Sequence, residues 1–348
     1  MLVFAGVVRF IKYIFMIKVA INGYGRIGRD LHRQILEAEG MEVVAINSRS
    51  GADSHAHLLK YDSLYGKCSK DVFVNDGNMV VDGKIVAVYQ IKDPKNIDWA
   101  KHDIDVVIES TGRFTSKADA SVHLASGAKN VLITAPCKDL DIPNIVMGVN
   151  DGEFNPSEHN VVSNASCTTN CLAPVMKVLN DEFGVKHGFV TTIHAFTFTQ
   201  NLLDNSNPSD FRRARATTES IIPTTTGAMK AIGRVIPALS GKLDGMAFRV
   251  PVPTVSCVDI VAKLDKKVTV EMLNETFEKY EFGDMSGILG TTKEPLVSVD
   301  FRGDHRSSIV DQLSTRVLDD DFVKVVAWYD NEWGYVSRIV DLLNWINS

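Results

Sequence analysis

A glycine-rich turn near the N-terminus constrains the fold more than any other feature of the sequence. Gly23, Gly25 and Gly28 have the spacing G-x-G-x-x-G, after the apolar run 17–21 and before an amphipathic helical pattern. A strand, a tight glycine turn and a helix in this order bring backbone N–H groups close to the pyrophosphate of a dinucleotide. The spacing therefore predicts dinucleotide binding, and a glycine turn with a purely structural role is the alternative.

The segments that follow alternate between strand and helix patterns. Strands are expected at 42–46, 72–74, 79–81, 85–88, 105–109, 130–134 and 145–149, with a helical segment near 117–126. Glycine-containing turns join the three short strands between residues 72 and 88. Alternation on this scale predicts an open, mostly parallel sheet.

The pattern changes after residue 167. A helix is expected to about residue 183, and an amphipathic helix at 334–346. Further strands are expected at 189–194, 243–249, 255–264, 297–301 and 323–328, in a larger and mostly antiparallel sheet. The predicted fold class is therefore α/β, with a Rossmann-type dinucleotide-binding domain and an α+β catalytic domain.

Charge and cysteine content exclude several classes of function. The 348 residues include 37 Lys and Arg against 43 Asp and Glu, a net charge of −6, which argues against nucleic acid or an anionic membrane as the main partner. The five cysteines form no dense framework, so we expect a cytoplasmic protein. Cys167 and Cys171 lie one helical turn apart, but no further ligands occur at matching spacing, and no metal site is expected.

Residues 1–16 need a separate interpretation. Residues 1–15 are apolar apart from Arg9 and Lys12, lack the features of a signal peptide, and are too few to span a bilayer. Because Met16 opens directly onto the first strand, we expect it to be the natural start and 1–16 to be an N-terminal extension. Intact-mass measurement of the natively expressed protein tests this, and a mass that includes Met1 would contradict it.

Cys167 is the strongest candidate for a reactive side chain. It is expected where a β-run ends and a helix begins, among small and hydroxyl residues. The N–H groups and partial positive charge of a helix N-terminus favour a thiolate, the nucleophilic form of cysteine. The same turn could also bind a phosphate or an oxyanion. A small buried cysteine with no chemical role is the alternative for a lone residue of this kind.

Later segments supply partners for this sulfur. His194 is expected at the end of the 189–194 strand, so Cys167 and His194 form a candidate nucleophile–base pair if the fold brings them together. The run 224–227 offers three threonines and a glycine, and Arg249 follows within the next strand. Hydroxyls, a glycine and an arginine are the groups that bind a phosphate anion.

The end of the second strand bears on the choice of cofactor. A carboxylate at this place would bind the adenosine ribose of NAD, but the chain has Asn47, Ser48, Arg49 and Ser50. An acid would repel a 2′-phosphate, whereas arginine and serine hold one. We therefore favour NADP or dual use, although Asp53 would serve a ribose if the loop folds back, and Arg49 would have no role if it simply faces solvent.

Together these residues resemble phosphorylating glyceraldehyde-3-phosphate dehydrogenases. The matching blocks occur in the family's order and spacing and cover the chain from about residue 17 to the C-terminus. They are NGYGRIGR, SNASCTTNCLAP, TTIHA, RRARA, IPTTTGA, GMAFRVP and WYDNEWGY. The resemblance implies that Cys167 attacks the aldehyde to give a thiohemiacetal, with His194 as base and as donor to the oxyanion. Oxidation then leaves a thioester, which inorganic phosphate attacks to release an acyl phosphate.

The resemblance also implies the binding residues. Thr197 and Arg249 resemble the substrate-phosphate site, and Asn331 is placed to hold the nicotinamide carboxamide. Ser166, Thr168, Thr226 and Gly227 resemble the site of the attacking phosphate. The expected cofactor-binding residues are Gly23, Gly25, Arg26, Ile27, Gly28, Ser48, Arg49, Lys92, Thr111, Gly112, Thr134, Ser206 and Asn331.

The resemblance further implies a homotetramer and a discontinuous cofactor domain. We expect the dinucleotide-binding domain to comprise 17–165 and 331–348, and the catalytic domain to comprise 166–330. The family's usual acid after the second strand is Ser48 here. In the family the loop after His194 crosses to the neighbouring subunit's cofactor, and members that use NADP tend to carry a serine near the position of Ser206. Arg212, Arg213 and Arg215 are expected in subunit contacts around this loop, with a solvated basic cluster as the alternative.

Two other functions compete with this interpretation. Erythrose-4-phosphate dehydrogenase is a close relative that generally lacks the residues corresponding to Thr197 and to the Thr226–Gly227 pair; both are present here, which favours acyl-phosphate formation. A non-catalytic binding protein on the same fold is the second, because fold alone does not exclude it. The intact nucleophile, base and anion sites argue against a loss of catalysis.

Overall fold

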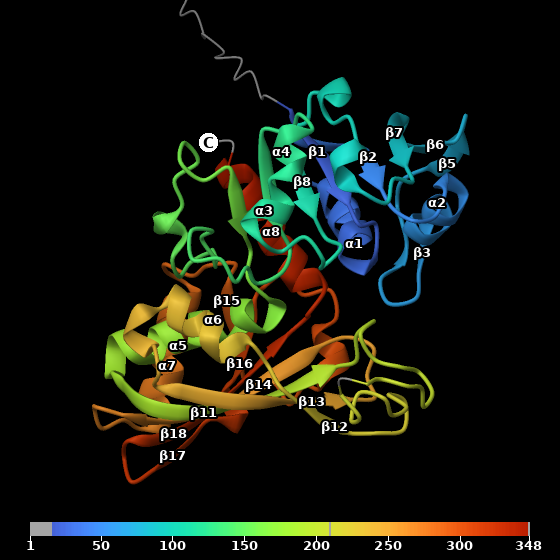
Figure 1. Ribbon diagram of the computed structural model, residues 1–348. Coiled ribbons are helices and arrows are strands. Elements are labelled where there is room, and N and C mark those ends of the chain that lie inside the picture. Colours follow the sequence, from blue (N-terminus) through green and yellow to red (C-terminus); the bar gives the residue numbers. More distant parts are fainter. Residues whose placement is uncertain (1–15, 209, 347–348) are drawn as a thin grey trace, which may run out of the picture.

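The computed structural model describes residues 16–208 and 210–346, and the expected extension therefore lies almost wholly outside the described residues. Two layered units lie one above the other in Figure 1. The upper unit contains an eight-stranded sheet in the order β10-β9-β8-β1-β2-β7-β6-β5. Its strands are β1 (Ile17–Asn22), β2 (Met41–Asn47), β5 (Val72–Asn75), β6 (Asn78–Val81), β7 (Lys84–Tyr89), β8 (Val106–Glu109), β9 (Asn130–Ile133) and β10 (Val161–Ser163).

Neighbouring strands of this upper sheet pair in parallel from β10 to β7, and the β7–β6 and β6–β5 pairs are antiparallel. The central strands are buried on both faces, as expected for a parallel sheet covered by helices. The helices of this unit are α1 (Arg26–Ile35), α2 (Ala52–Lys60), α3 (Lys117–Ala120) and α4 (Val122–Ala125), and a small hairpin is formed by β3 (Tyr61–Asp62) and β4 (Gly66–Lys67). The predicted strand–turn–helix–strand unit is confirmed.

The lower unit is built on a second sheet, in the order β12-β13-β11-β14-β18-β16-β15, with β17 paired to β18. Its strands are β11 (Val185–Ala195), β12 (Ile222–Thr224), β13 (Leu243–Val250), β14 (Ser256–Leu264), β15 (Leu289–Thr292), β16 (Ser308–Asp311), β17 (Arg316–Leu318) and β18 (Phe322–Tyr329). Its helices are α5 (Cys167–Phe183), α6 (Ala228–Val235) and α7 (Val270–Glu281). Only β11–β13 and β15–β16 pair in parallel, so the sheet is mostly antiparallel as predicted.

The last helix, α8 (Trp333–Ile346), packs in the upper unit although it follows the lower one in sequence. Figure 1 shows α8, in red, beside the blue helix α1. Val336, Ile339 and Leu343 of α8 share one apolar core with Ile21 and Leu31. α8 therefore packs against the first elements of the described chain.

Buried polar side chains connect the carboxyl ends of three neighbouring strands in the upper sheet. Asn47 Nδ2 donates to Asn22 Oδ1 at 2.8 Å, and Asn22 Nδ2 donates to Glu109 Oε2 at 2.6 Å. Trp99 donates its indole N–H to His123 Nδ1, so His123 carries its proton on Nε2, which lies 3.1 Å from Glu109 Oε2. This ladder fixes the edge of the sheet where a parallel α/β unit binds its ligand.

Two predicted strands are wrong. Residues 147–150 form a turn, and the chain before it pairs with β10 only through an isolated bridge between Asn144 and Ser163. Asn150 Oδ1 accepts the N–H of Val146 at 2.8 Å, and Gly148 has φ +76°. Residues 298–301 form a 3-10 helix, in which the Asp300 carboxylate accepts the N–H of Val297 at 2.8 Å. In both segments a local side-chain hydrogen bond to the backbone replaces strand pairing.

Candidate active site

The turn between β10 and α5 is ordered by its own polar side chains and presents Cys167 as the first helical residue. Ser166 is the N-cap, and its Oγ accepts the N–H of Thr169 at 3.1 Å. Asn170 Nδ2 donates to the carbonyl of Asn164 at 2.8 Å. Ala165 has φ +53°, an uncommon value for a residue other than glycine. The chain therefore reverses sharply just before the cysteine, and the predicted helix start is confirmed.

The structure brings Cys167 and His194 together, although they lie on different elements. Cys167 Sγ is 3.6 Å from His194 Nε2, and His194 is the next-to-last residue of β11. His194 Nδ1 is 2.7 Å from the carbonyl oxygen of Ala195. A carbonyl only accepts, and this one lies within reach of both Nδ1 and Arg249 Nη1, which is 3.0 Å away. This arrangement places the ring proton on Nδ1, so that the approach of Nη1 to Nδ1 is not a hydrogen bond, and leaves the lone pair of Nε2 facing the sulfur. His194 is therefore oriented to accept the thiol proton.

Arg249 lies beside this pair on the adjacent strand. β11 and β13 run parallel, and their register places His194 opposite Arg249. Arg249 Nη1 is 3.0 Å from the Ala195 carbonyl oxygen, 2.9 Å from His194 Nδ1 and 3.5 Å from Thr197 Oγ1. One guanidinium thus contacts the base, the backbone that orients it and a candidate phosphate-binding hydroxyl.

Burial dominates the protonation state of this site. The pKa of His194 is lowered to about 3 by burial and then by the Arg249 charge. Burial also raises the pKa of the Cys167 thiol, while Arg249 and the N–H group of Thr168 oppose that rise. The expected thiolate-favouring contributions are therefore present, and burial opposes them.

The remaining candidate anion-binding residues lie around the start of two helices. Thr168 is buried at the start of α5, and its Oγ1 is 3.0 Å from the Tyr329 hydroxyl. Thr226 Oγ1 accepts the N–H of Ala228 at 3.2 Å, and Gly227 is the N-cap of α6. A Cβ at Gly227 would meet nothing within 4 Å and its φ is negative, so the fold itself does not require glycine there.

The three glycines of the dinucleotide motif have distinct surroundings. Gly23 has φ +100°, and a Cβ there would lie 2.7 Å from the backbone of Ser110. A Cβ at Gly28 would lie 2.6 Å from the carbonyl oxygen of Gly23. Gly25 is exposed, has ordinary φ and would accept a Cβ without contact. The first and third glycines thus serve turn and packing, and the second leaves open backbone at the start of α1, which fits an approaching pyrophosphate.

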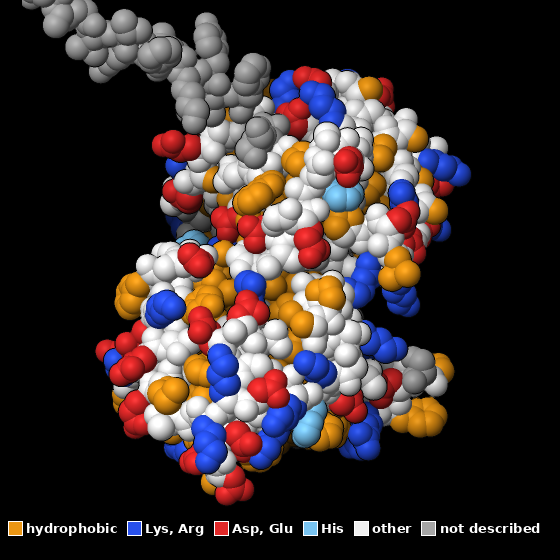
Figure 2. All heavy atoms as spheres, turned by 90° about the vertical axis from the view of Figure 1, so that its left-hand side faces the viewer, with side chains coloured by type: hydrophobic (Ala, Val, Ile, Leu, Met, Phe, Trp, Pro, Cys, Tyr) orange, Lys and Arg blue, Asp and Glu red, His pale blue; other side chains and the backbone are white. Residues whose placement is uncertain are grey.

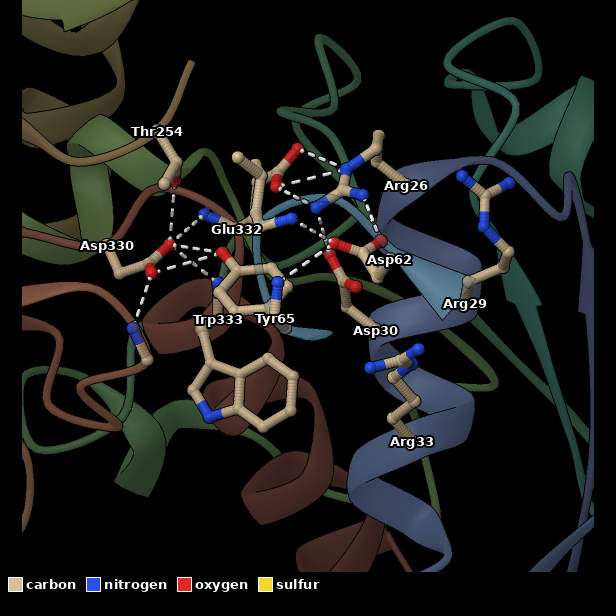
Figure 3. A network of polar contacts seen from close by, with 12 residues as sticks. Arg26, Arg29, Asp30, Arg33, Asp62, Tyr65, Thr254, Asp330, Glu332 and Trp333 are labelled. Atoms are coloured by element: carbon tan, nitrogen blue, oxygen red, sulfur yellow. Dashed lines mark hydrogen bonds and ion pairs between the residues drawn. The ribbon is translucent and has the colours of Figure 1, made fainter. Parts of the chain in front are cut away.

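Arg26 follows this turn, but its guanidinium is directed to carboxylates rather than to the open side (Figure 3). Its Nη2 is 2.6 Å from Glu332 Oε2, its Nη1 contacts Asp62, and Asp30 lies 3.7 Å from Nη2. The groups left for a phosphate are the N–H groups of Arg26 and Ile27, which have no partner within the first turn of a helix. The Arg26 side chain instead joins the dinucleotide turn to the segment before α8.

Comparisons with known proteins identify the family of the chain. The family model "Glyceraldehyde 3-phosphate dehydrogenase, NAD binding domain" matches residues 17–117, and "Glyceraldehyde 3-phosphate dehydrogenase, C-terminal domain" matches residues 166–331. The chain belongs to the glyceraldehyde-3-phosphate dehydrogenase family.

Curated relatives in this family match nearly the whole chain. The glyceraldehyde-3-phosphate dehydrogenases of Priestia megaterium and Geobacillus stearothermophilus are each 53% identical, over 95% of this chain and 98% of their own length. Glyceraldehyde-3-phosphate dehydrogenase 1 of Schizosaccharomyces pombe is 50% identical over 94% of this chain and 96% of its own length. These matches confirm the predicted family and fold class. They also confirm that the protein is an oxidoreductase that uses NAD(P).

The other residues expected to bind the cofactor in this family lie mostly along one edge of the upper sheet. Ser48, Thr111 and Thr134 directly follow or lie just beyond β2, β8 and β9, and Gly112 has φ +69°. Thr111 Oγ1 contacts Glu109, and Thr134 Oγ1 donates to the carbonyl of Glu109 at 3.3 Å. Arg49 and Lys92 are exposed. Because they are exposed, the guanidinium of Arg49 and the ammonium of Lys92 are accessible to a ligand.

Ser206 stands apart from this edge. It lies exposed in the 197–217 loop, which leaves the lower sheet beside β12 and β13 (Figure 1). Its N–H donates to Oδ1 of the neighbouring Asn205 at 2.8 Å, which is a local contact within the loop. Within this chain the structure does not join Ser206 to Ser48 or Arg49.

Sequence reasoning missed three residues at this site. Tyr329, Glu332 and Ser256 contact Thr168, Arg26 and Asn331, respectively. Tyr329 and Glu332 lie within the WYDNEWGY block, so only their roles went unassigned. Ser256 begins a strand of alternating residues and carries no local signal, because its partners come from β11 and from the segment before α8.

Two other classes of site receive no support within 16–208 and 210–346. No cluster of three or more His, Cys, Asp or Glu side chains suitable for a metal ion occurs there. No helix in the same ranges has the length and apolar character needed to cross a membrane. On the face drawn in Figure 2, Lys and Arg lie among Asp and Glu, and neither sign forms a continuous field.

Proposed function

We propose that this protein oxidises D-glyceraldehyde 3-phosphate in the presence of inorganic phosphate to 1,3-bisphosphoglycerate, with NAD or NADP as the oxidant. The observation that carries the proposal is the 3.6 Å contact between Cys167 Sγ and His194 Nε2, beside the Arg249 guanidinium. A nucleophile, an oriented base and an anion-binding group are the parts that acyl transfer through sulfur requires.

Covalent chemistry begins at the sulfur. His194 Nε2 takes the thiol proton as Cys167 Sγ bonds to the aldehyde carbon, and it returns that proton to the former carbonyl oxygen, which gives a thiohemiacetal. A nicotinamide, when bound, supplies the acceptor for the hydride from this carbon. His194 Nε2 removes the hydroxyl proton in the same step, and the product is a thioester of Cys167. A phosphate oxygen then bonds to the thioester carbon as the bond from this carbon to Cys167 Sγ breaks. The acyl phosphate is released, and the Cys167 thiolate takes back the proton held by His194 Nε2.

The lowered pKa of His194 keeps its imidazole neutral, and it also makes the imidazole a weak base in the free protein. An imidazole that is neutral over the whole physiological range is always available as a base. Positive charge on the ring is transient, and the nearby Arg249 disfavours it, which promotes return of the proton to the oxyanion. The raised pKa of Cys167 means that the thiolate forms as the aldehyde arrives rather than standing free in the resting protein.

Two anion sites are assigned to the two phosphates of the reaction. Arg249 and Thr197 bind the phosphate of the substrate, supported by their 3.5 Å contact next to His194. Ser166, Thr168, Thr226 and Gly227 bind the attacking phosphate. The open space above Gly227 and the helix starts nearby supply room and N–H donors for that anion.

For the cofactor, we favour NADP or dual use over strict NAD preference. The backbone of Gly25, Arg26 and Ile27 receives the pyrophosphate, and Asn331 receives the nicotinamide carboxamide. Thr111, Gly112, Thr134 and Lys92 line the same edge. Ser48 places no negative charge beside the ribose, and the exposed Arg49 makes no ion pair with any described residue, which leaves it free for a 2′-phosphate.

The assembly that we propose is a cytoplasmic homotetramer. Phe198, Leu202, Leu203 and Phe211 of the 197–217 loop are between 64% and 103% exposed, and Phe189 on the lower sheet is 67% exposed. Apolar side chains gathered in this way mark a surface that another subunit covers. In the tetramer this loop would carry Ser206 to the cofactor of a neighbour. The division into 17–165 with 331–348 and 166–330 follows the return of α8 to α1.

Erythrose-4-phosphate dehydrogenase and a non-catalytic binding protein are not favoured. Steady-state kinetics with glyceraldehyde 3-phosphate and erythrose 4-phosphate, each with NAD and NADP, tests the proposal. We expect phosphate-dependent turnover of the first aldehyde, and loss of turnover to below roughly one-thousandth in Cys167→Ser. Cys171→Ala is the matched control, because this second cysteine lies buried one turn further along α5 and should leave turnover intact. Turnover of Cys167→Ser near that of the wild type would refute the mechanism.

A further inference from the structure

The side-chain amide of Asn331 is hydrogen-bonded at its oxygen but not at its nitrogen within the described residues. Its Oδ1 is 2.9 Å from Ser256 Oγ. Its Nδ2 makes no hydrogen bond to any residue that the structure describes, and it is not among the fully enclosed polar atoms. The residue as a whole is only 6% exposed. An amide that is buried except at its nitrogen is oriented toward a ligand.

The donors and acceptors at Ser256 decide which end of this amide is open. The N–H of Ala195 donates to Ser256 Oγ at 3.0 Å. Ser256 is 2% exposed, so its own hydroxyl proton needs an acceptor, and Asn331 Oδ1 is the acceptor in reach. If the amide were reversed, Nδ2 would donate to Ser256 Oγ, and the hydroxyl proton of this buried serine would have no acceptor among the described residues. Ser256 therefore holds Oδ1 inward and Nδ2 outward.

The backbone around Ser256 is also fixed in an unusual way. Val255, which precedes it, has φ +67°, a strained value for a β-branched residue. Ser256 begins β14, where it pairs with Tyr329 of β18 and also contacts Ala195 of β11. Ser256 thus stands between the residue that follows His194 and the segment that carries Asn331.

The backbone of Asn331 is held on both sides by its neighbours (Figure 3). Asp330 accepts hydrogen bonds from Tyr65, Thr254 and the N–H of Gly303, and Glu332 is paired with Arg26. The backbone position of Asn331 therefore does not depend on Ser256. The role left for Ser256 is to fix the rotation of the side-chain amide of Asn331.

We propose that Ser256 is a positioning residue for the nicotinamide. By fixing Oδ1 of Asn331, it presents the Nδ2 donor to the carbonyl oxygen of the carboxamide and so selects a ring that carries an acceptor at that place. This inference rests on the proposed function, in which Asn331 contacts the nicotinamide. It assigns to Ser256 no contact with substrate or cofactor, since it acts through Asn331.

Binding of two ligands to the full-length protein tests this proposal. NAD or NADP, whichever the protein binds more tightly, contains the nicotinamide, and the matching ADP-ribose or 2′-phospho-ADP-ribose lacks it. Titration calorimetry on Ser256→Ala should show the dinucleotide Kd raised roughly tenfold, because a buried hydrogen bond that orients the amide is lost. The Kd of the ADP-ribose ligand should not change. Ser256→Thr, which keeps the hydroxyl, should restore the dinucleotide Kd.

Three further variants complete the test. Ser308→Ala removes another buried hydroxyl of the same sheet, on β16, and should leave both Kd values unchanged. Asn331→Ala should weaken the dinucleotide alone. Ser256→Cys, with a weaker donor of similar size, should give an intermediate Kd and serves if Ser256→Ala does not fold.

Each possible result either supports or contradicts the proposal. Selective loss of dinucleotide affinity in Ser256→Ala and Asn331→Ala supports the proposal. Loss in Asn331→Ala alone overturns it and leaves the proposed nicotinamide contact standing. An unchanged Kd in Asn331→Ala removes that contact itself, and equal weakening of both ligands in Ser256→Ala would show a general structural role instead. The face of hydride transfer, read by NMR with a deuterated aldehyde, should be less strictly kept in Ser256→Ala than in Ser308→Ala.

Discussion

His194 and Arg249 face each other across a pair of parallel strands, with Arg249 Nη1 2.9 Å from His194 Nδ1. A cation is thus placed beside a base rather than beside an acid. The Arg249 charge and burial together keep the imidazole neutral, and the same charge opposes the burial that raises the pKa of Cys167. One arginine therefore tunes both halves of the nucleophile–base pair.

Replacing Arg249 with Gln should raise the pKa of Cys167, because the only opposing side-chain charge is lost. The rate of Cys167 alkylation by iodoacetamide, measured against pH in the free protein, should then rise at higher pH than in the wild type. Arg316→Gln, a change at an arginine of β17, is the control and should leave the profile in place. An unshifted profile for Arg249→Gln would show that Arg249 does not act on the sulfur.

Cys257 offers an internal comparison for the same measurement. Burial and the nearby carboxylates of Asp259 and Asp311 raise its pKa to about 12. No cation opposes this rise, in contrast to Cys167. At neutral pH, mapping of alkylated peptides should therefore show Cys167 modified well before Cys257.

His32 should make the folded protein sensitive to acid. It is buried in α1, its Nδ1 lies 2.6 Å from the Tyr24 hydroxyl, and burial lowers its pKa to about 3. An unfolded chain binds a proton at this position below about pH 6.5, whereas the folded chain does not, so stability falls as pH drops from about 6.5 toward 3. His194 contributes in the same direction.

His32→Phe should therefore flatten this acid limb. Between pH 7 and pH 5, its free energy of unfolding should fall by about 2 kcal/mol less than that of the wild type. Reversible urea unfolding at fixed protein concentration measures both slopes. Tyr24→Phe loses the same hydrogen bond but keeps the buried imidazole, so its slope should match the wild type. A His32→Phe slope as steep as that of Tyr24→Phe would contradict the assignment.

A structural feature could be predicted from the sequence when the contacts that determine it join residues close together in the chain. The glycine turn and the helix start at Cys167 depend on residues within one turn of each other, and both were predicted. The strands predicted at 145–149 and 297–301 failed because an asparagine and an aspartate bind nearby N–H groups, which an apolar pattern does not reveal. The role of Ser256 depends on three distant segments, so no local pattern could indicate it.

Ser48 and Arg49 are predicted to set the choice between NAD and NADP. Ser48→Asp should weaken NADP by at least roughly tenfold relative to NAD, because a carboxylate there would repel the 2′-phosphate. Arg49→Ala should weaken NADP more than NAD. Steady-state kinetics with both cofactors measures the ratio, and Lys95→Ala, at an exposed lysine paired with Asp93, provides the control. Equal effects of Arg49→Ala on both cofactors would show that Arg49 does not contact the 2′-phosphate.

The 197–217 loop is predicted to lie in a subunit interface. Phe211 is 82% exposed there, and Phe282, at the end of α7, is equally exposed. Phe211→Asp should convert the tetramer to smaller species in sedimentation velocity, because burying a carboxylate in an apolar contact is costly. Phe282→Asp should leave the tetramer intact. A tetramer that survives Phe211→Asp would place the interface elsewhere.

The return of α8 to α1 also determines when the upper unit becomes complete during synthesis. Tyr335, Val336 and Leu343 fill the same core as β1 and α1, and Glu332 pairs with Arg26 of the dinucleotide turn. When the first 165 residues have been synthesised, helix α8, which packs against this core, has therefore not yet been made. Because domains generally fold as units during synthesis, the dinucleotide turn gains its contact with Glu332 and its full apolar support only when the segment from Glu332 onward emerges. The dinucleotide turn is thus made early in the described chain and completed late.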